Sequence, residues 1–110
     1  MKEKKQNFYA KVLKPEDLVE YQDGAVVSRM LIYEKAGTIS VFAFTAGQGL
    51  SEHTAPYDSI VLILEGDASI TIGGTEHHVN PREIIILPAQ IPHIINAISN
   101  CKMMLTLIHE

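Results

Sequence analysis

The sequence has little cysteine and no long apolar run, and both absences exclude classes of protein. Of its 110 residues only Cys101 is a cysteine, so an intrachain disulfide is excluded, and its apolar surroundings predict a small buried side chain rather than a catalytic thiol. No apolar run reaches the roughly 18 residues that a membrane span requires. Residues 1–7 are rich in lysine and lack the apolar stretch of a signal peptide. We therefore expect a cytoplasmic protein with no membrane partner.

Positive charge is also sparse. Nine lysine and arginine residues stand against 13 acidic residues, which gives a net charge of −4. Apart from Lys2, Lys4 and Lys5 the basic residues are dispersed, so no cationic stripe is available for a phosphate backbone. Nucleic acid is therefore not an expected partner. Apolar residues make up 46% of the chain and charged residues 20%, a balance typical of a globular protein.

Helical periodicity is absent from most of the chain. Pro15, Glu16 and Asp17 predict the first turn of a short helix, because proline fits there and carboxylates favour the positive end of the helix dipole; it should end by Gly24. About eight short strands follow, which predict a sandwich or closed barrel, since the sheets must hide their edges and one apolar face. We expect a single domain over residues 1–110, with its barrel over about 24–110. The predicted strands cover residues 25–33, 38–45, 59–64, 68–72, 75–79, 83–87, 93–98 and 102–109.

Two local patterns refine this prediction. Gly73 and Gly74 indicate a two-residue hairpin, because a primed turn needs positive φ values that glycine reaches freely, so residues 75–79 should pair with residues 68–72. Residues 84–86 are three consecutive isoleucines, which predict a strand covered on both faces, by the interior and by a neighbouring sheet or another subunit. A homodimer is therefore expected.

Five histidines are candidates for chemistry, because imidazole is the commonest metal ligand and general base. His77 and His78 are neighbours on one predicted strand, so their side chains point to opposite faces and cannot line one site. His109 lies next to the end of the sequence, where a precise ligand geometry is hard to hold. His53 follows a glycine-bearing loop and His93 begins a predicted strand, so both side chains can point inward from a barrel rim.

Two motifs around these histidines resemble those of the cupin superfamily. Gly47, five further residues, His53 and later the Leu-Glu-Gly of residues 64–66 look like the first cupin motif, G-x5-H-x-H-x3-4-E-x6-G. Pro88 and His93 match the second motif, G-x5-P-x-G-x2-H-x3-N, in register. The two motifs span nearly half of the chain. The resemblance implies an all-β, single-domain jelly-roll β-barrel.

Several family positions carry other residues in this sequence. The second histidine of the first motif falls on Ala55 and its glutamate falls on Ser59. The glycines of the second motif fall on Arg82 and Gln90, and its asparagine falls on Ala97. The site that the family builds is therefore incomplete here.

The resemblance implies a divalent metal held by three histidines and a glutamate, of which only His53 and His93 are present. Asp58 or Glu52 is a candidate third ligand, and two histidines with one carboxylate suit Fe, Mn or Ni with open positions for a substrate. Asp58 lies one residue from the family's glutamate position, so on a regular strand its side chain would point to the opposite face. It could reach the site only if this segment were a loop or contained a bulge. The cofactor is therefore a divalent transition metal (Fe, Mn, Ni or Zn), or none.

Four functions fit these observations. The leading hypothesis is a cupin that binds a small molecule, either through a metal held weakly by His53 and His93 or through direct contacts of these histidines. The first alternative is a metal-dependent oxygenase or isomerase. The second is a metal-free enzyme resembling the sugar epimerases of this fold, with His53 or His93 as base and Tyr57 as acid. The third is a non-catalytic structural barrel.

Overall fold

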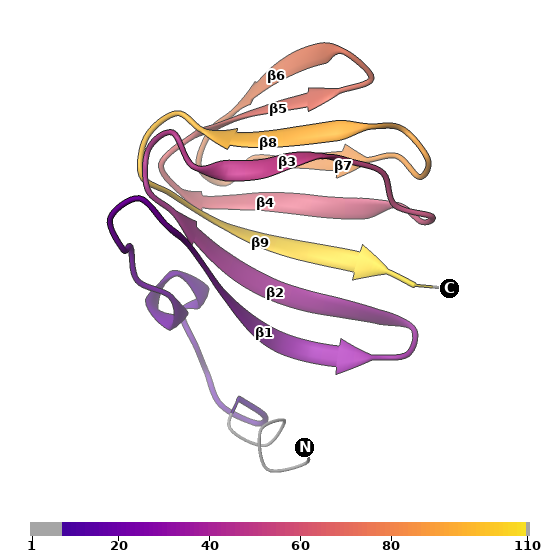
Figure 1. Cartoon of the computed structure of the whole chain (residues 1–110). Coiled ribbons are helices and arrows are strands. Elements are labelled where there is room, and N and C mark those ends of the chain that lie inside the picture. The colour runs from indigo at the N-terminus through magenta and orange to yellow at the C-terminus, as the bar shows by residue number, and fades with distance from the viewer. Residues whose placement is uncertain (1–7, 110) are drawn as a thin grey trace.

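Two antiparallel sheets pack face to face in the computed structural model, which describes residues 8–109 (Figure 1). One sheet has the strand order β1-β2-β9-β4-β7 and the other has the order β3-β8-β5-β6. This architecture confirms the predicted all-β jelly-roll barrel. The strands are β1 (Val26–Glu34), β2 (Gly37–Phe44), β3 (Gly49–His53), β4 (Ser59–Glu65), β5 (Ala68–Ile72), β6 (Thr75–Val79), β7 (Ile84–Leu87), β8 (His93–Ala97) and β9 (Cys101–Ile108).

The predicted elements agree with the observed ones except at two places. The structure has nine strands within residues 8–109, because residues 49–53, which the sequence presented as a loop, form β3. The expected short helix is a single 3-10 turn, η1 (Pro15–Leu18), with proline in its first turn. No helix among the described residues is long and apolar enough to cross a membrane. Residues 1–7, on which the signal-peptide argument depended, lie outside the described residues.

The predicted hairpin joins β5 to β6. Gly73 and Gly74 have φ values of 55° and 86°, the left-handed region that a primed turn requires. Strand β6 pairs with β5 from Ile72 opposite Thr75 at the turn to Ala68 opposite Val79 at the far end. The glycine pair therefore fixes both the turn and the register.

The main core lies between the two sheets. Cys101 is fully buried and free, as predicted, and burial, followed by the charges of Asp67 and Glu65, raises the pKa of its thiol to about 12. The thiol therefore stays protonated and packs as a small apolar group. The buried residues of this core are Phe44, Val61, Ile63, Ala68, Ile70, Val79, Leu87, Ile95, Ala97, Cys101, Met103 and Leu105.

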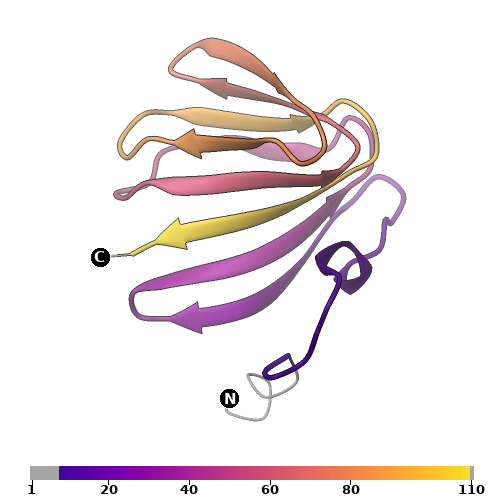
Figure 2. The ribbon, with the colours of Figure 1, turned by 180° about the vertical axis from the view of Figure 1, so that it is seen from behind.

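A smaller cluster covers the outer face of the five-stranded sheet, where the segment around η1 lies against β1 and β2 (Figure 2). Val19 packs on Val41 and Ala43, and Met104 also packs here rather than in the interior. Met30 of β1 is 46% exposed. Of the methionines in the described residues, only Met103 is therefore buried in the main core.

Strand β7 lies at the edge of its sheet and is covered on one face only. Leu87 points into the core, whereas Ile84 and Ile86 are 59% and 54% exposed. The second covering layer predicted for these isoleucines is not supplied by the described part of this chain. The homodimer therefore stays a prediction.

Candidate functional site

His53 and His93, which are 40 positions apart in the chain, meet at one end of the barrel. His53 is the last residue of β3 and His93 is the first residue of β8, and the two lie directly opposite each other in the antiparallel pair. Their rings are in edge-to-face contact, with centroids 4.3 Å apart. The fold therefore brings together the two histidines that the motifs singled out.

A bulge in β3 turns His53 towards His93. Leu50 lies opposite Ile95 and His53 lies opposite His93, so three steps along β3 match two steps along β8. On a regular strand, residues three apart point to opposite faces, but the extra residue of a bulge restores His53 to the face of Leu50. The position of His53 therefore depends on the bulge.

Gly49 lets β3 approach β8 closely enough to form this pair. A Cβ atom at Gly49 would lie 2.0 Å from the carbonyl oxygen of Ile95, far inside van der Waals contact. Any larger residue would therefore push β3 away from β8. The glycine of the loop sequence has a packing role that supports the site.

The hydrogen bonds of the two rings fix their tautomers. The Nδ1–H of His53 donates to the carbonyl of Ser51 at 2.7 Å, and the Nδ1–H of His93 donates to the carbonyl of Ile91 at 3.3 Å. A carbonyl oxygen can only accept, so Nδ1 carries a hydrogen in both rings and each neutral ring has its lone pair on Nε2. The two Nε2 atoms are 3.0 Å apart. Two lone pairs at this distance repel each other, so the contact requires either a shared proton, which makes an N–H···N hydrogen bond, or a metal ion between the rings.

The two histidines differ in exposure. His53 is exposed at the rim, whereas the His93 residue is only 3% exposed. Burial, followed by the proximity of His53, lowers the pKa of His93, and the hydrogen bond to the carbonyl of Ile91 opposes this shift. His93 therefore favours the neutral form, which is the form that binds a metal ion.

Asp58, a candidate third ligand, holds the loop that precedes β8. Its carboxylate accepts a hydrogen bond from the backbone N–H of Ala89 at 2.8 Å, and the N–H of Gln90 donates to the carbonyl of Ala55 at 2.8 Å. Glu52, the other candidate, is an exposed residue of β3. Within residues 8–109 no three histidine, cysteine or acidic side chains converge into a set that could hold a metal ion. The described residues therefore supply two nitrogens and no complete ligand set.

Two further residues at this end of the barrel were singled out in the sequence. Tyr57 lies in the loop before β4 and is 42% exposed. Ser59, at the position of the family's glutamate, is 1% exposed, and its hydroxyl has no hydrogen-bond partner among the described residues. Ser59 pairs with Leu107 and Leu87 at the end of the five-stranded sheet, so its surroundings are apolar.

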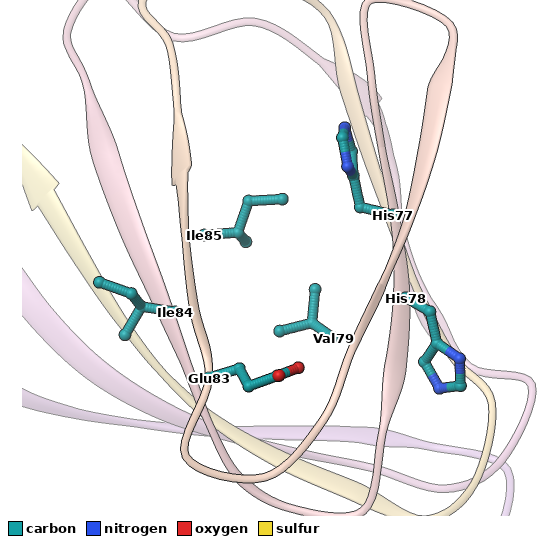
Figure 3. Close-up of a pocket in the computed structure, with 6 residues that line it drawn as sticks. All are labelled: His77, His78, Val79, Glu83, Ile84 and Ile85. Carbon is teal, nitrogen blue, oxygen red and sulfur yellow. The ribbon is translucent and has the colours of Figure 1, made fainter.

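The remaining histidines lie elsewhere. His78 points away from the barrel and donates from Nε2 to Asp67 at 2.5 Å, whereas His77 lies on the opposite face of β6, as the alternation of a strand predicts. A cavity of about 440 Å³ lies between β6 and β7 and is lined in part by His77 and Glu83, whose side chains are labelled in Figure 3. Sequence reasoning missed this cavity, because nothing in the pattern shows that the two sheet edges separate there.

The fold and the histidine pair at its end define a small barrel of the cupin class. Residues 40–109, more than half of the chain, match the sequence profile of the cupin domain family. The chain therefore belongs to the cupin superfamily. None of the curated proteins compared with the chain matches it.

Solved structures agree with this family. A conserved protein of unknown function from Streptococcus pyogenes is 33% identical, with 93% of this chain and 90% of that chain covered and a TM-score of 0.88. A cupin superfamily protein from Desulfitobacterium hafniense is 28% identical, with 92% and 93% covered and a TM-score of 0.87. A cupin conserved barrel domain protein from Leptotrichia buccalis is 34% identical with a TM-score of 0.82, and the alignment covers 84% of this chain and 45% of that longer chain.

Proposed function

We propose that this cupin binds a small molecule at the His53–His93 pair, through a divalent metal ion that the two imidazoles hold weakly. The observation that carries the proposal is the pair of Nε2 atoms 3.0 Å apart, with both Nδ1–H groups donated to backbone carbonyls. Metal-bound histidines commonly donate their second ring N–H to a carbonyl or carboxylate in this way. The hydrogen bonds from Nδ1–H therefore leave the Nε2 atom of both rings available to bind one cation.

The spacing of the two nitrogens fits a shared metal ion. Two nitrogens each about 2.1 Å from a metal, at an angle between tetrahedral and octahedral values, are about 3.0–3.4 Å apart. The observed separation of 3.0 Å lies at the short end of this range. Imidazole ligands suit Zn, Fe and Ni. A metal held there would supply a Lewis acid with positions left open for an oxygen-bearing ligand.

The incomplete ligand set determines how tightly a metal is held. No third side chain joins the pair within residues 8–109, and Asp58 uses one carboxylate oxygen to hold the N–H of Ala89. Water or the bound small molecule must therefore fill the remaining positions. This favours a binding protein whose metal and ligand affinities depend on each other over a protein with a permanent metal centre.

Metal content and metal-dependent stability test the proposal. Untagged protein purified without chelator is analysed for its elements, and its thermal unfolding is followed on adding Mn, Fe, Co, Ni, Cu or Zn. We expect one of these metals, added in excess, to saturate the site at about one ion per chain and to raise the melting temperature. Loss of a hydrogen-bond partner behind a metal ligand costs 10–100-fold in affinity, so loss of a ligand itself, in His53→Ala or His93→Ala, should cost at least about 100-fold.

His77→Ala is the matched control, because His77 lies on the same sheet but outside the pair. It should leave metal binding unchanged. Equal loss in all three variants would point to unspecific binding, and retention of metal in both His53→Ala and His93→Ala would contradict the proposal. Absence of any metal and of any thermal shift in the wild-type protein would also overturn it.

A further inference from the structure

A cavity separate from the histidine pair opens where the two sheets separate. It has a volume of about 440 Å³ and lies between β6 and β7, each of which is the last strand of its sheet (Figure 3). This volume falls in the range of roughly 300–1,000 Å³ that is common for small-molecule sites. The cavity is open to solvent, so a small ligand can enter without any movement of the barrel.

The lining of the cavity combines an apolar floor with two polar groups. Val79 and Ile85 point towards each other across the gap, with Glu83 at one end and His77 at the other, whereas Ile84 and His78 point away (Figure 3). Val79 is 4% exposed and belongs to the main core, and Ile85 packs against that core, so the floor is apolar.

Both polar groups have free binding capacity. One carboxylate oxygen of Glu83 accepts a hydrogen bond from the N–H of Asn80 at 2.8 Å, which leaves the other oxygen available. His77 lies in register with Ile70, on the inward face of its sheet, and its ring has no hydrogen bond with the described residues. Within residues 8–109 no lysine or arginine lines the cavity, so the carboxylate of Glu83 gives it a negative end.

We propose that this cavity is a second ligand site, which binds a small organic amine with an apolar body and a polar group at its far end. The ammonium group pairs with the free oxygen of Glu83, because this is the charge complementary to the carboxylate. The apolar body lies on Val79 and Ile85, and the far polar group hydrogen-bonds to the ring of His77. The site does not depend on a metal or on the proposed function of the His53–His93 pair.

Titration of the ¹⁵N-labelled full chain with 5-amino-1-pentanol tests the site. Saturable shifts should appear in the amide signals of β6 and β7. Pentylamine, which lacks the hydroxyl, should bind about fivefold more weakly, as expected for one neutral hydrogen bond of about 1 kcal/mol. Pentanoate, which carries the opposite charge, should not saturate the site. This arm uses the wild-type chain only.

Two variants assign the contacts. Glu83→Gln keeps an oxygen that can accept from Asn80 and removes the charge, so it should weaken both amines about fivefold, the effect of one solvent-exposed ion pair. His77→Ala should weaken 5-amino-1-pentanol and leave pentylamine unchanged. The same titration of His53→Ala should match the wild-type protein. Pentanoate binding as tightly as the amine, shifts that do not saturate, or unchanged amine affinity in Glu83→Gln would overturn the proposal.

Discussion

The chain contains two pairs of histidines that differ in a simple way. One pair is adjacent in the sequence but separated in the fold, whereas the other is distant in the sequence but in contact in the fold. His77 and His78 are adjacent, yet they point to the two faces of β6, and among the described residues only His78 has a hydrogen-bond partner, Asp67. His53 and His93 are 40 positions apart, yet their Nε2 atoms are 3.0 Å apart. Adjacency along a strand separates side chains, whereas adjacency across strands brings them together. A candidate site in a β-protein is therefore defined by the pairing of its strands.

The two pairs also differ in the structural features that position their side chains. The His53–His93 pair depends on the β3 bulge and on Gly49, whereas His78 depends on one carboxylate at the surface. Changes to the backbone around β3 should therefore affect the first pair strongly and the second pair little.

The largest expected effect follows from Gly49→Ala. The new Cβ would lie 2.0 Å from the carbonyl oxygen of Ile95, so β3 must move away from β8, and the free energy of unfolding should fall by about 2–4 kcal/mol. Urea denaturation measures the loss. The control is Gly74→Ala, which has positive φ but no atom within 4 Å of its Cβ and should cost about 1 kcal/mol. Equal losses of unfolding free energy in the two variants would show that the close approach of β3 to β8 at Gly49 does not contribute to stability.

An intermediate effect of opposite sign is expected for Ser59→Ala. The Ser59 hydroxyl is buried and has no hydrogen-bond partner in the described part of the chain, so its removal should raise the free energy of unfolding by about 1 kcal/mol. Ser69→Ala is the matched control, because the Ser69 hydroxyl donates to Glu76, and its removal should destabilise the protein by a similar amount. A loss of stability in Ser59→Ala would show that its hydroxyl does have a partner.

Gln90→Gly should have a smaller stabilising effect. Gln90 has a φ of 68°, which costs about 1–2 kcal/mol for a residue with a Cβ, and the added flexibility of glycine in the unfolded chain offsets part of the gain. The net rise should be about 0.5 kcal/mol in a denaturant experiment. Gln48→Gly, at a position without positive φ, should instead lower stability. A lower free energy of unfolding in both variants would contradict backbone strain at Gln90.

The smallest effect concerns the pH dependence that Asp67 contributes. The hydrogen bond from Ser99, followed by that from His78, lowers the pKa of Asp67 below its usual value. A carboxylate with a lowered folded-state pKa stabilises the protein above its unfolded-state pKa of about 3.9 and loses this contribution as the pH falls through the folded-state pKa. The melting temperature of Asp67→Asn should therefore lie below that of the wild type at pH 6 and approach it below pH 4. A constant difference across this range would argue against the lowered pKa.

The sequence predicted most strands and the histidine pair because local signals determine both. The Gly73-Gly74 turn fixed one hairpin, and the motif spacing pointed to His53 and His93. The glycine positions of the second cupin motif also carried information about the backbone. Arg82 and Gln90, which replace those glycines here, both have positive φ. Backbone conformation at these positions is the property that the motif records.

Other features could not be predicted because they depend on tertiary contacts. Strand β3 was missed because its bulge breaks the alternation that identifies strands. The engagement of Asp58 with Ala89 depends on two loops that are distant in sequence. The cavity lined by His77 and Glu83 exists only because β6 and β7 end separate sheets.

The ring nitrogens of His53 and His93 provide the most direct test of the central claim that the two rings share one cation. Long-range ¹H–¹⁵N spectra of the histidine rings, recorded before and after addition of one equivalent of Zn²⁺, report which nitrogen carries hydrogen and which binds metal. We predict hydrogen on Nδ1 of both residues at the start and a joint shift of both Nε2 signals with Zn²⁺, while His77 and His78 stay unchanged. Hydrogen found on Nε2 of both neutral rings, or a Zn²⁺ shift confined to one of the two histidines, would contradict the shared site.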